Sequence, residues 1–189
     1  HLILGNHDSR PNFRERFPEV GVDNNGFVQY EKAVGKFRAL FLDTNEPGTH
    51  SGVFCEQRAN WLSQRLAEGD SPVLLFMHHP AFHLGIPVMD RIGLVDNEWL
   101  LTALKGHEHR VKHLFFGHIH RPISGSWRGI PFSTLRGTNH QVALHLRESE
   151  DIPGSFEPPQ YGVVLLDEDS VLVHLHDFLD RSERFWLGA

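Results

Sequence analysis

Three short apolar runs, each followed directly by a loop rich in histidine and asparagine, set the strongest limit on how this chain folds. The runs cover residues 2–4, 73–77 and 111–116. The loops that follow them are Gly5-Asn6-His7-Asp8, His78-His79-Pro80 and Gly117-His118-Ile119-His120. A continuous apolar run is typical of a strand covered on both faces of a sheet. Ligands of α/β sheets gather at the carboxyl ends of such strands, so we expect the three loops to converge.

The remaining segments indicate an α/β fold that becomes all-β toward the C-terminus. Apolar residues at helical spacing predict helices around residues 13–17, 54–66 and 99–104. Further strands are predicted at residues 27–34, 37–42, 123–127, 130–135 and 141–146, and a hairpin at 161–175. We therefore expect two packed β-sheets flanked by helices, forming one domain across residues 1–189.

Composition argues against some classes of partner. The formal net charge is −6, whereas nucleic-acid polymers usually bind a basic surface. The single cysteine, Cys55, cannot form a disulfide within the chain, which fits a cytoplasmic setting. No apolar run is long enough to cross a membrane, so no membrane partner is expected. The C-terminal strands and the tail Phe185-Trp186-Leu187 are compatible with packing in a homo-oligomer.

The side chains in the three loops suit transition metals. Imidazole nitrogens and an amide oxygen are good ligands for Zn, Mn, Fe or Co. Two such ions about 4 Å apart can clamp a phosphoester and activate water. In His118-Ile119-His120 the middle residue is apolar, so both imidazoles would lie on one side of an extended segment. No carboxylate that could bridge two ions is evident in these loops.

The three motifs, in this order, resemble those of the calcineurin-like metallophosphoesterases, and the resemblance covers nearly the whole chain. The stretches Phe76–Pro80 and Phe132–Gln141 are similar to the bacterial branch of glycerophosphodiester and class III cyclic-nucleotide phosphodiesterases. This resemblance implies an αββα sandwich with its site at one rim. It also implies a phosphodiesterase that uses a hydroxide activated by two divalent metal ions on a small phosphodiester substrate.

The resemblance also assigns roles to individual residues. Asn6, His78 and His118 match the ligands of the second metal ion, and His120 matches a ligand of the first. His7 matches a histidine that contacts the phosphate or protonates the leaving alkoxide, and a pKa near 6.5 suits either role. His140 matches a later active-site histidine of the phosphodiesterase branch.

Two motifs of the family do not occur in the chain: the opening Asp-x-His and the Gly-Asp-x-x-Asp that supplies a bridging aspartate. Both would precede His1, which itself opens what reads as the middle of a strand. We therefore expect the C-terminal portion of a longer enzyme, inactive by itself. The alternative is a non-catalytic or inactive metal-binding scaffold that lacks the ligands of the first metal ion.

Other histidines have simpler interpretations. The register set by Pro80 makes His79 a neighbour of the ligands rather than a ligand. His107-Glu108-His109 resembles a metal-binding cluster, but it lies at a predicted helix end, where a cationic histidine interacts favourably with the helix dipole. We therefore assign these histidines structural roles.

Overall fold

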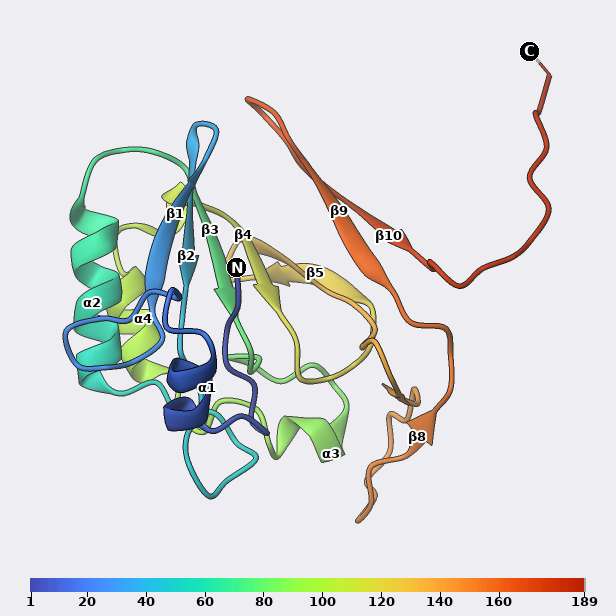
Figure 1. Ribbon diagram of the computed structural model, residues 1–189, viewed down its shortest axis with the longest axis horizontal. Coiled ribbons are helices and arrows are strands. Elements are labelled where there is room, and N and C mark those ends of the chain that lie inside the picture. The colour runs from blue at the N-terminus through green and yellow to red at the C-terminus, as the bar shows by residue number, and fades with distance from the viewer. Residues whose placement is uncertain (189) are drawn as a thin grey trace.

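The computed structural model describes residues 1–188, which are built around one six-stranded mixed sheet (Figure 1). The strands lie in the order β1-β2-β3-β4-β6-β5. Their bounds are β1 Tyr30–Val34, β2 Phe37–Phe41, β3 Val73–Met77, β4 Val111–Phe116, β5 Ile123–Trp127 and β6 Ile130–Thr134. β2, β3, β4 and β6 run parallel, and the edge strands β1 and β5 are antiparallel to their neighbours. The carboxyl ends of the four parallel strands therefore meet at one edge.

Two of the five helical elements in residues 1–188 cover one face of this sheet. The elements are α1 Arg10–Arg16, α2 Glu56–Ala67, α3 Pro87–Asp90, α4 Glu98–Leu104 and the 3₁₀ turn η1 Glu108–Arg110. α2 and α4 pack side by side, as Figure 1 shows. Leu62 and Leu66 of α2 and Leu100 of α4 are buried in the same core cluster as Leu40 and Leu75 of the sheet. Burying each of these side chains contributes roughly 1.5–3 kcal/mol, so this layer anchors the sheet.

The opposite face of the sheet carries a row of stacked aromatic rings, called here the aromatic row: Tyr30, Phe41, Phe76 and Phe115. Successive ring centroids lie 4.6, 4.9 and 4.8 Å apart, and successive planes are inclined by 17°, 19° and 14°. The row follows from the strand register, because Tyr30 pairs with Phe41, Phe41 with Phe76, and Phe76 with Phe115. The aromatic row therefore links β1 through β4.

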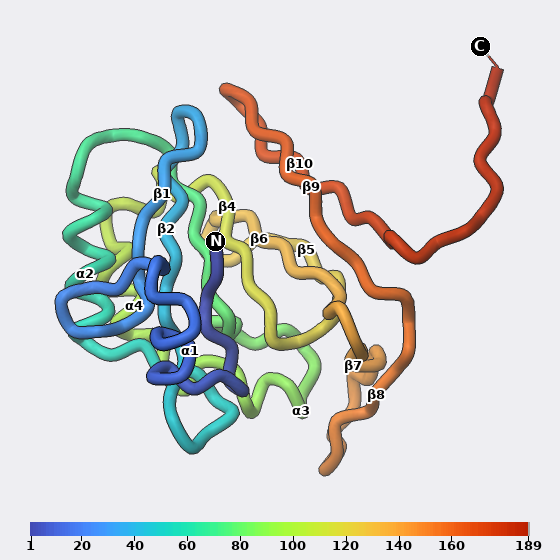
Figure 2. The backbone as a smooth tube through the Cα atoms, viewed as in Figure 1, coloured from blue at the N-terminus to red at the C-terminus, as the bar shows by residue number. Residues whose placement is uncertain are grey.

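Two small sheets complete the described chain. β7 (Gln141–Val142) pairs with β8 (Gly154–Ser155), and β9 (Tyr161–Leu166) pairs with β10 (Val171–His176). The β9–β10 hairpin stands apart from the main sheet, and the segment after it extends away from the body (Figure 2). Across residues 1–188 no helix combines the length and apolar character needed to cross a membrane.

The α/β class predicted from the sequence is confirmed, and several elements need correction. Residues 2–4 do not form the predicted strand: Leu4 is buried and the Tyr30 hydroxyl donates to the Leu2 carbonyl at 2.8 Å, but the segment has no ladder within residues 1–188. The apolar pattern therefore predicted the burial of Leu4 correctly, but it did not show whether a neighbouring strand pairs with this segment. The strand predicted at residues 27–34 begins only at Tyr30. The reason is that the Val28 backbone N–H donates to the Asp43 carboxylate instead of to the backbone of a neighbouring strand. β7 is two residues long, not six.

Candidate metal centre

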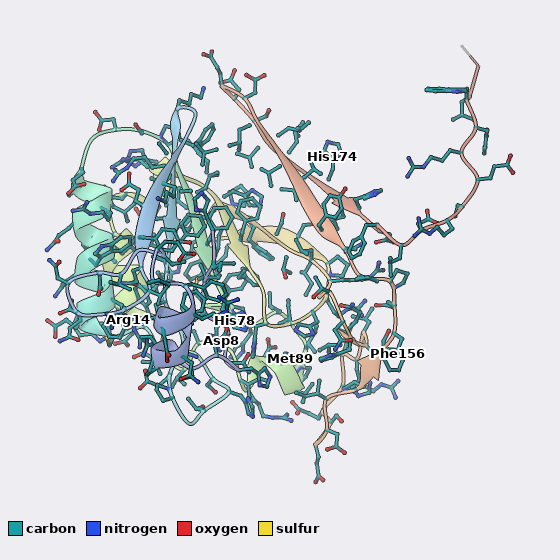
Figure 3. The ribbon with its side chains drawn as sticks, viewed as in Figure 1. Asp8, Arg14, His78, Met89, Phe156 and His174 are labelled. Atoms are coloured by element: carbon teal, nitrogen blue, oxygen red, sulfur yellow. The ribbon has the colours of Figure 1, made fainter. Side chains whose placement is uncertain are left out.

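The three histidine-bearing loops meet at the carboxyl edge of the sheet. His78 follows β3, His118 follows β4, and Asn6 lies in the turn after the N-terminal apolar run. In Figure 3 His78 lies beside the loop that carries Asp8. The Asp8 carboxylate accepts from the Gly5 backbone at 2.7 Å, which closes this loop into a tight turn.

Asn6 and His78 are in direct contact. The Nε2–H of His78 donates to Oδ1 of Asn6 at 3.0 Å, so the two predicted ligand atoms face each other. Glycines allow this approach: a Cβ on Gly5 would lie 3.1 Å from the His78 ring, and one on Gly117 would lie 3.4 Å from it. The approach is tight at Gly5, where a Cβ would require the His78 ring to move by a few tenths of an ångström, whereas at Gly117 it is close to ordinary van der Waals contact.

His118 is a buried side chain with an unsatisfied nitrogen. The residue is 7% exposed, its ring centroid is 5.2 Å from that of His78, and its Nε2 has no hydrogen-bond partner. Its backbone is also in the left-handed region, at φ 70°. Buried polar atoms are nearly always paired, and backbone strain concentrates at functional sites. A metal ion is a partner that fits this orphaned nitrogen.

Burial keeps the two imidazoles neutral. Desolvation, followed by the neighbouring histidines, lowers the pKa of His78 to about 2. The same two causes lower the pKa of His118 to about 3. Metal ions bind neutral imidazoles, so both side chains have the charge state that a ligand requires at neutral pH.

His79 lies close to these histidines, but both of its ring nitrogens are engaged. The ligand atoms of His78, His79 and His118 are all within 4.8 Å of one another. The Nε2–H of His79 donates to the His50 carbonyl at 3.1 Å, and the Thr44 hydroxyl donates to Nδ1 at 2.8 Å. With no lone pair left, His79 acts as a support that ties the β2 and β3 loops together. Desolvation by burial lowers its pKa to about 4.

Substituting Gly52 is expected to disturb this support. A Cβ at Gly52 would lie 2.5 Å from Cγ and Nδ1 of His79, a separation that forces one of the two residues to shift. We expect Gly52→Ala to lower the free energy of unfolding by about 1–3 kcal/mol, the usual cost of overpacking. Urea unfolding measures the change, with Ser51→Ala as the neighbouring control. Equal midpoints for Gly52→Ala and the unsubstituted protein would contradict the packing described here.

His120 and His140 form a second pair. The Nδ1–H of His120 donates to the His140 carbonyl at 2.9 Å, and the two ring centroids are 4.8 Å apart. This hydrogen bond leaves Nε2 of His120 as the nitrogen available to a ligand. Burial lowers the pKa of His120. The nearby His7 also lowers the pKa values of His78, His118 and His120, so all four rings belong to one region.

One geometric argument from the sequence was wrong. The spacing of His118 and His120 predicted an extended segment with both rings on one side. Instead their φ angles are 70° and 45°, both left-handed. The backbone curls at this turn, and the two rings have different protein partners: His78 and His79 for His118, and His140 for His120.

Residues after β2 also shape the site, although the sequence reading did not assign them. Nδ2 of Asn45 donates to the carbonyls of Gly5 and Asp8, at 2.8 and 3.1 Å, and so holds the Asn6 turn. Nδ2 of Asn6 donates to Nδ1 of His50 at 3.2 Å. The position of Asn45 beyond a parallel strand is a signal that could have found it. His50 lies within an exposed loop, and nothing in the sequence around it indicates a role in the site.

The carboxylates of these loops are committed elsewhere. Asp43 accepts two hydrogen bonds from Arg10 and one each from the backbones of Val28 and Asn45. Among the described residues, His78, His79 and His118 are the one group of three or more histidine, cysteine or acidic side chains with metal-binding spacing. His107-Glu108-His109, which lies at η1, forms no such group.

An amide oxygen and neutral imidazoles lie together at the carboxyl edge of a mostly parallel sheet in this α/β fold, and this set of side chains fits a divalent transition metal ion. The sequence pattern of the family described as calcineurin-like phosphoesterase matches residues 1–122. The chain belongs to the calcineurin-like phosphoesterase family.

Individual relatives agree with this membership. A "probable cyclic nucleotide phosphodiesterase" of Rhodopseudomonas palustris is 45% identical over 192 residues, which cover 98% of this chain and 69% of that protein. A "probable glycerophosphodiester phosphodiesterase" of Arcobacter nitrofigilis is 31% identical, over 97% of this chain and 68% of the relative. A glycerophosphodiester phosphodiesterase of Enterobacter lignolyticus is 34% identical, over 75% of this chain and 52% of the relative.

Proposed function

We propose that this chain is the C-terminal portion of a metal-dependent phosphodiesterase acting on a glycerophosphodiester or a cyclic nucleotide. The observation that carries the proposal is the convergence of Oδ1 of Asn6, Nε2 of His78 and the unpaired Nε2 of His118. The names of the relatives, which include both kinds of phosphodiesterase, support the substrate class.

Two divalent ions, of Mn, Fe, Zn or Co, are the cofactors in this proposal. Asn6, His78 and His118 would hold the second ion, and His120 would help to hold the first. When bound, such ions acidify water and neutralise charge on a phosphoryl group. The protein contributes neutral imidazoles and an amide oxygen that is held by a hydrogen bond from His78.

His7 and His140 have substrate-directed roles in this proposal. His7 follows Asn6 in sequence and lies near the rings of His78 and His118, and in this proposal its imidazole would donate to a phosphoryl oxygen or protonate the leaving alkoxide. His140 packs against His120, and this contact supports a role for His140 on the side of the site that would hold the first metal ion. Its carbonyl fixes the orientation of the His120 ring.

The proposal also covers what a complete site requires. Two ions need a bridging carboxylate, and Asp43 is engaged by Arg10 and two backbone amides, while the exposed Asp8 accepts from the Gly5 amide of its own turn. We propose that chain preceding His1 in the intact enzyme supplies the bridging residue. We also propose that it supplies strands of the second packed sheet that the sequence predicts. The aromatic row and the apolar residues 2–4 would face that second sheet.

The experiment is hydrolysis of bis(p-nitrophenyl) phosphate by the full-length protein. We expect the metal-free protein to be inactive and Mn²⁺ to restore activity, because the donor set is built for divalent transition ions. Comparing a cyclic nucleotide with a glycerophosphodiester then assigns the substrate class. The segment 1–189 alone should be inactive under the same conditions. If full-length protein binds metal but hydrolyses none of these esters with Mn, Fe, Zn or Co, it is a non-catalytic metal-binding scaffold instead.

A further inference from the structure

We propose that His50 is a positioning residue that fixes the orientation of the Asn6 side-chain amide toward the metal centre. The inference rests on the proposed function, because it assigns a partner to one of the metal ligands. His50 is an exposed loop residue. Its ring contacts the two consecutive residues Asn6 and His7, at 3.2 Å from the Asn6 amide nitrogen and 5.3 Å between the ring centroids of His7 and His50.

The two ends of the Asn6 amide have different partners, and this difference selects one orientation. Oδ1 accepts from His78, and Nδ2 donates to Nδ1 of His50. Rotating the amide by half a turn would set Nδ2 against the N–H of His78 and Oδ1 against the lone pair of His50. With the ring tautomers that the two observed bonds require, a proton on Nε2 of both His78 and His50, both contacts would then be mismatched, donor against donor and acceptor against acceptor.

The bond from His50 gains importance when metal binds. The nitrogen of an imidazole that binds a metal ion carries no proton, so a His78 ring that ligates through Nε2 no longer donates to Asn6. The bond between Nδ2 of Asn6 and His50 remains, and it keeps Oδ1 directed toward the centre. Partners of metal ligands that do this typically contribute 10–100-fold to metal affinity or activity.

Buried residues hold the His50 backbone, although its ring is exposed. The His50 carbonyl accepts from Nε2 of His79, and the Thr44 hydroxyl fixes the other side of the His79 ring. His79 is fully buried. Substituting the His50 side chain therefore leaves this backbone anchor in place, so the role of the ring can be tested without dismantling the loop.

Three substitutions separate the two ring nitrogens. In His50→Asn the side-chain oxygen can take the position of Nδ1, whereas in His50→Gln it reaches the position of Nε2. His50→Ala removes both. We expect His50→Ala to weaken Mn²⁺ binding by about tenfold, since the ligand orientation is lost. His50→Asn should recover most of the affinity, and His50→Gln should resemble His50→Ala.

The measurement is a titration of metal-free full-length protein with Mn²⁺. Binding is monitored by calorimetry or by the electron paramagnetic resonance signal of free Mn²⁺. His109→Ala, a substitution of an exposed histidine at η1, serves as the control and should bind as the unsubstituted protein does. His118→Ala serves as the reference for loss of a ligand.

The outcomes distinguish the two proposals. If His118→Ala loses Mn²⁺ affinity while all three His50 variants keep it, the positioning role is overturned and the proposed metal centre stands. The same holds if His50→Gln recovers affinity and His50→Asn does not, because Nδ1 is then not the atom responsible. If His118→Ala binds Mn²⁺ unchanged, the proposed metal centre itself fails.

Discussion

His118→Ala is expected to lower kcat/KM of the full-length enzyme toward bis(p-nitrophenyl) phosphate at least about a hundredfold. Losing a partner of a metal ligand costs 10–100-fold, and loss of the ligand itself should cost more. The physical reason is local: His118 supplies a buried, neutral, unpaired nitrogen beside His78. The rate with saturating Mn²⁺ measures the effect, together with the Mn²⁺ dissociation constant.

A second variant, His118→Gly, tests whether misfolding explains a loss of activity in His118→Ala. Alanine at a φ of 70° is strained, whereas glycine adopts this conformation readily. His118→Gly should therefore fold at least as well as His118→Ala and be equally inactive. Activity near that of the unsubstituted enzyme in either variant would remove His118 from the mechanism.

Acid is expected to destabilise the metal-free protein steeply. His78, His79 and His118 have folded pKa values of about 2, 4 and 3, each below the 6.5 of an unfolded histidine. The unfolded state therefore binds these protons first. Stability from the neutral rings is complete well above pH 6.5 and is lost as the pH falls from there toward the folded pKa values. At pH 5.5 each group costs about 1.4 kcal/mol relative to pH 8, or about 4 kcal/mol for the three.

Urea unfolding of the metal-free protein at pH 8 and pH 5.5 measures this change. His79→Gln retains hydrogen-bonding capacity but does not titrate, so its free energy of unfolding should fall by about 1.4 kcal/mol less over the same interval. An equal fall in His79→Gln and in the unsubstituted protein would show that His79 is not held neutral in the fold.

Elements governed by local pattern were predictable from the sequence. The helical spacing over residues 54–66 and the apolar runs that became β3 and β4 needed no tertiary information, since burial and period decide them. Residues 2–4 show the limit of that signal. Leu4 is buried as expected, whereas Leu2 is exposed, and strand formation also requires a partner backbone, which an apolar pattern does not predict.

The candidate site divides in the same way. Asn6, His78 and His118 could be predicted because each follows an apolar run, and parallel strands bring such positions to one edge. The left-handed backbone at His118 and His120 could not be, because the sequence between Gly117 and His120 does not favour it over an extended form. His50 was missed for a different reason: its contacts with Asn6 and His79 join residues 44 and 29 positions apart.

The aromatic row has a consequence for how this chain could be altered. Its rings join β2, β3 and β4 laterally a residue or two before the chain turns into His78 and His118. Sliding one strand past the next would break several ring contacts at once. The packing of the aromatic row therefore helps to fix the strand register, and with it the position of the carboxyl end of each strand. Substitutions of exposed side chains in the loops beyond these strands should therefore leave the strand register unchanged.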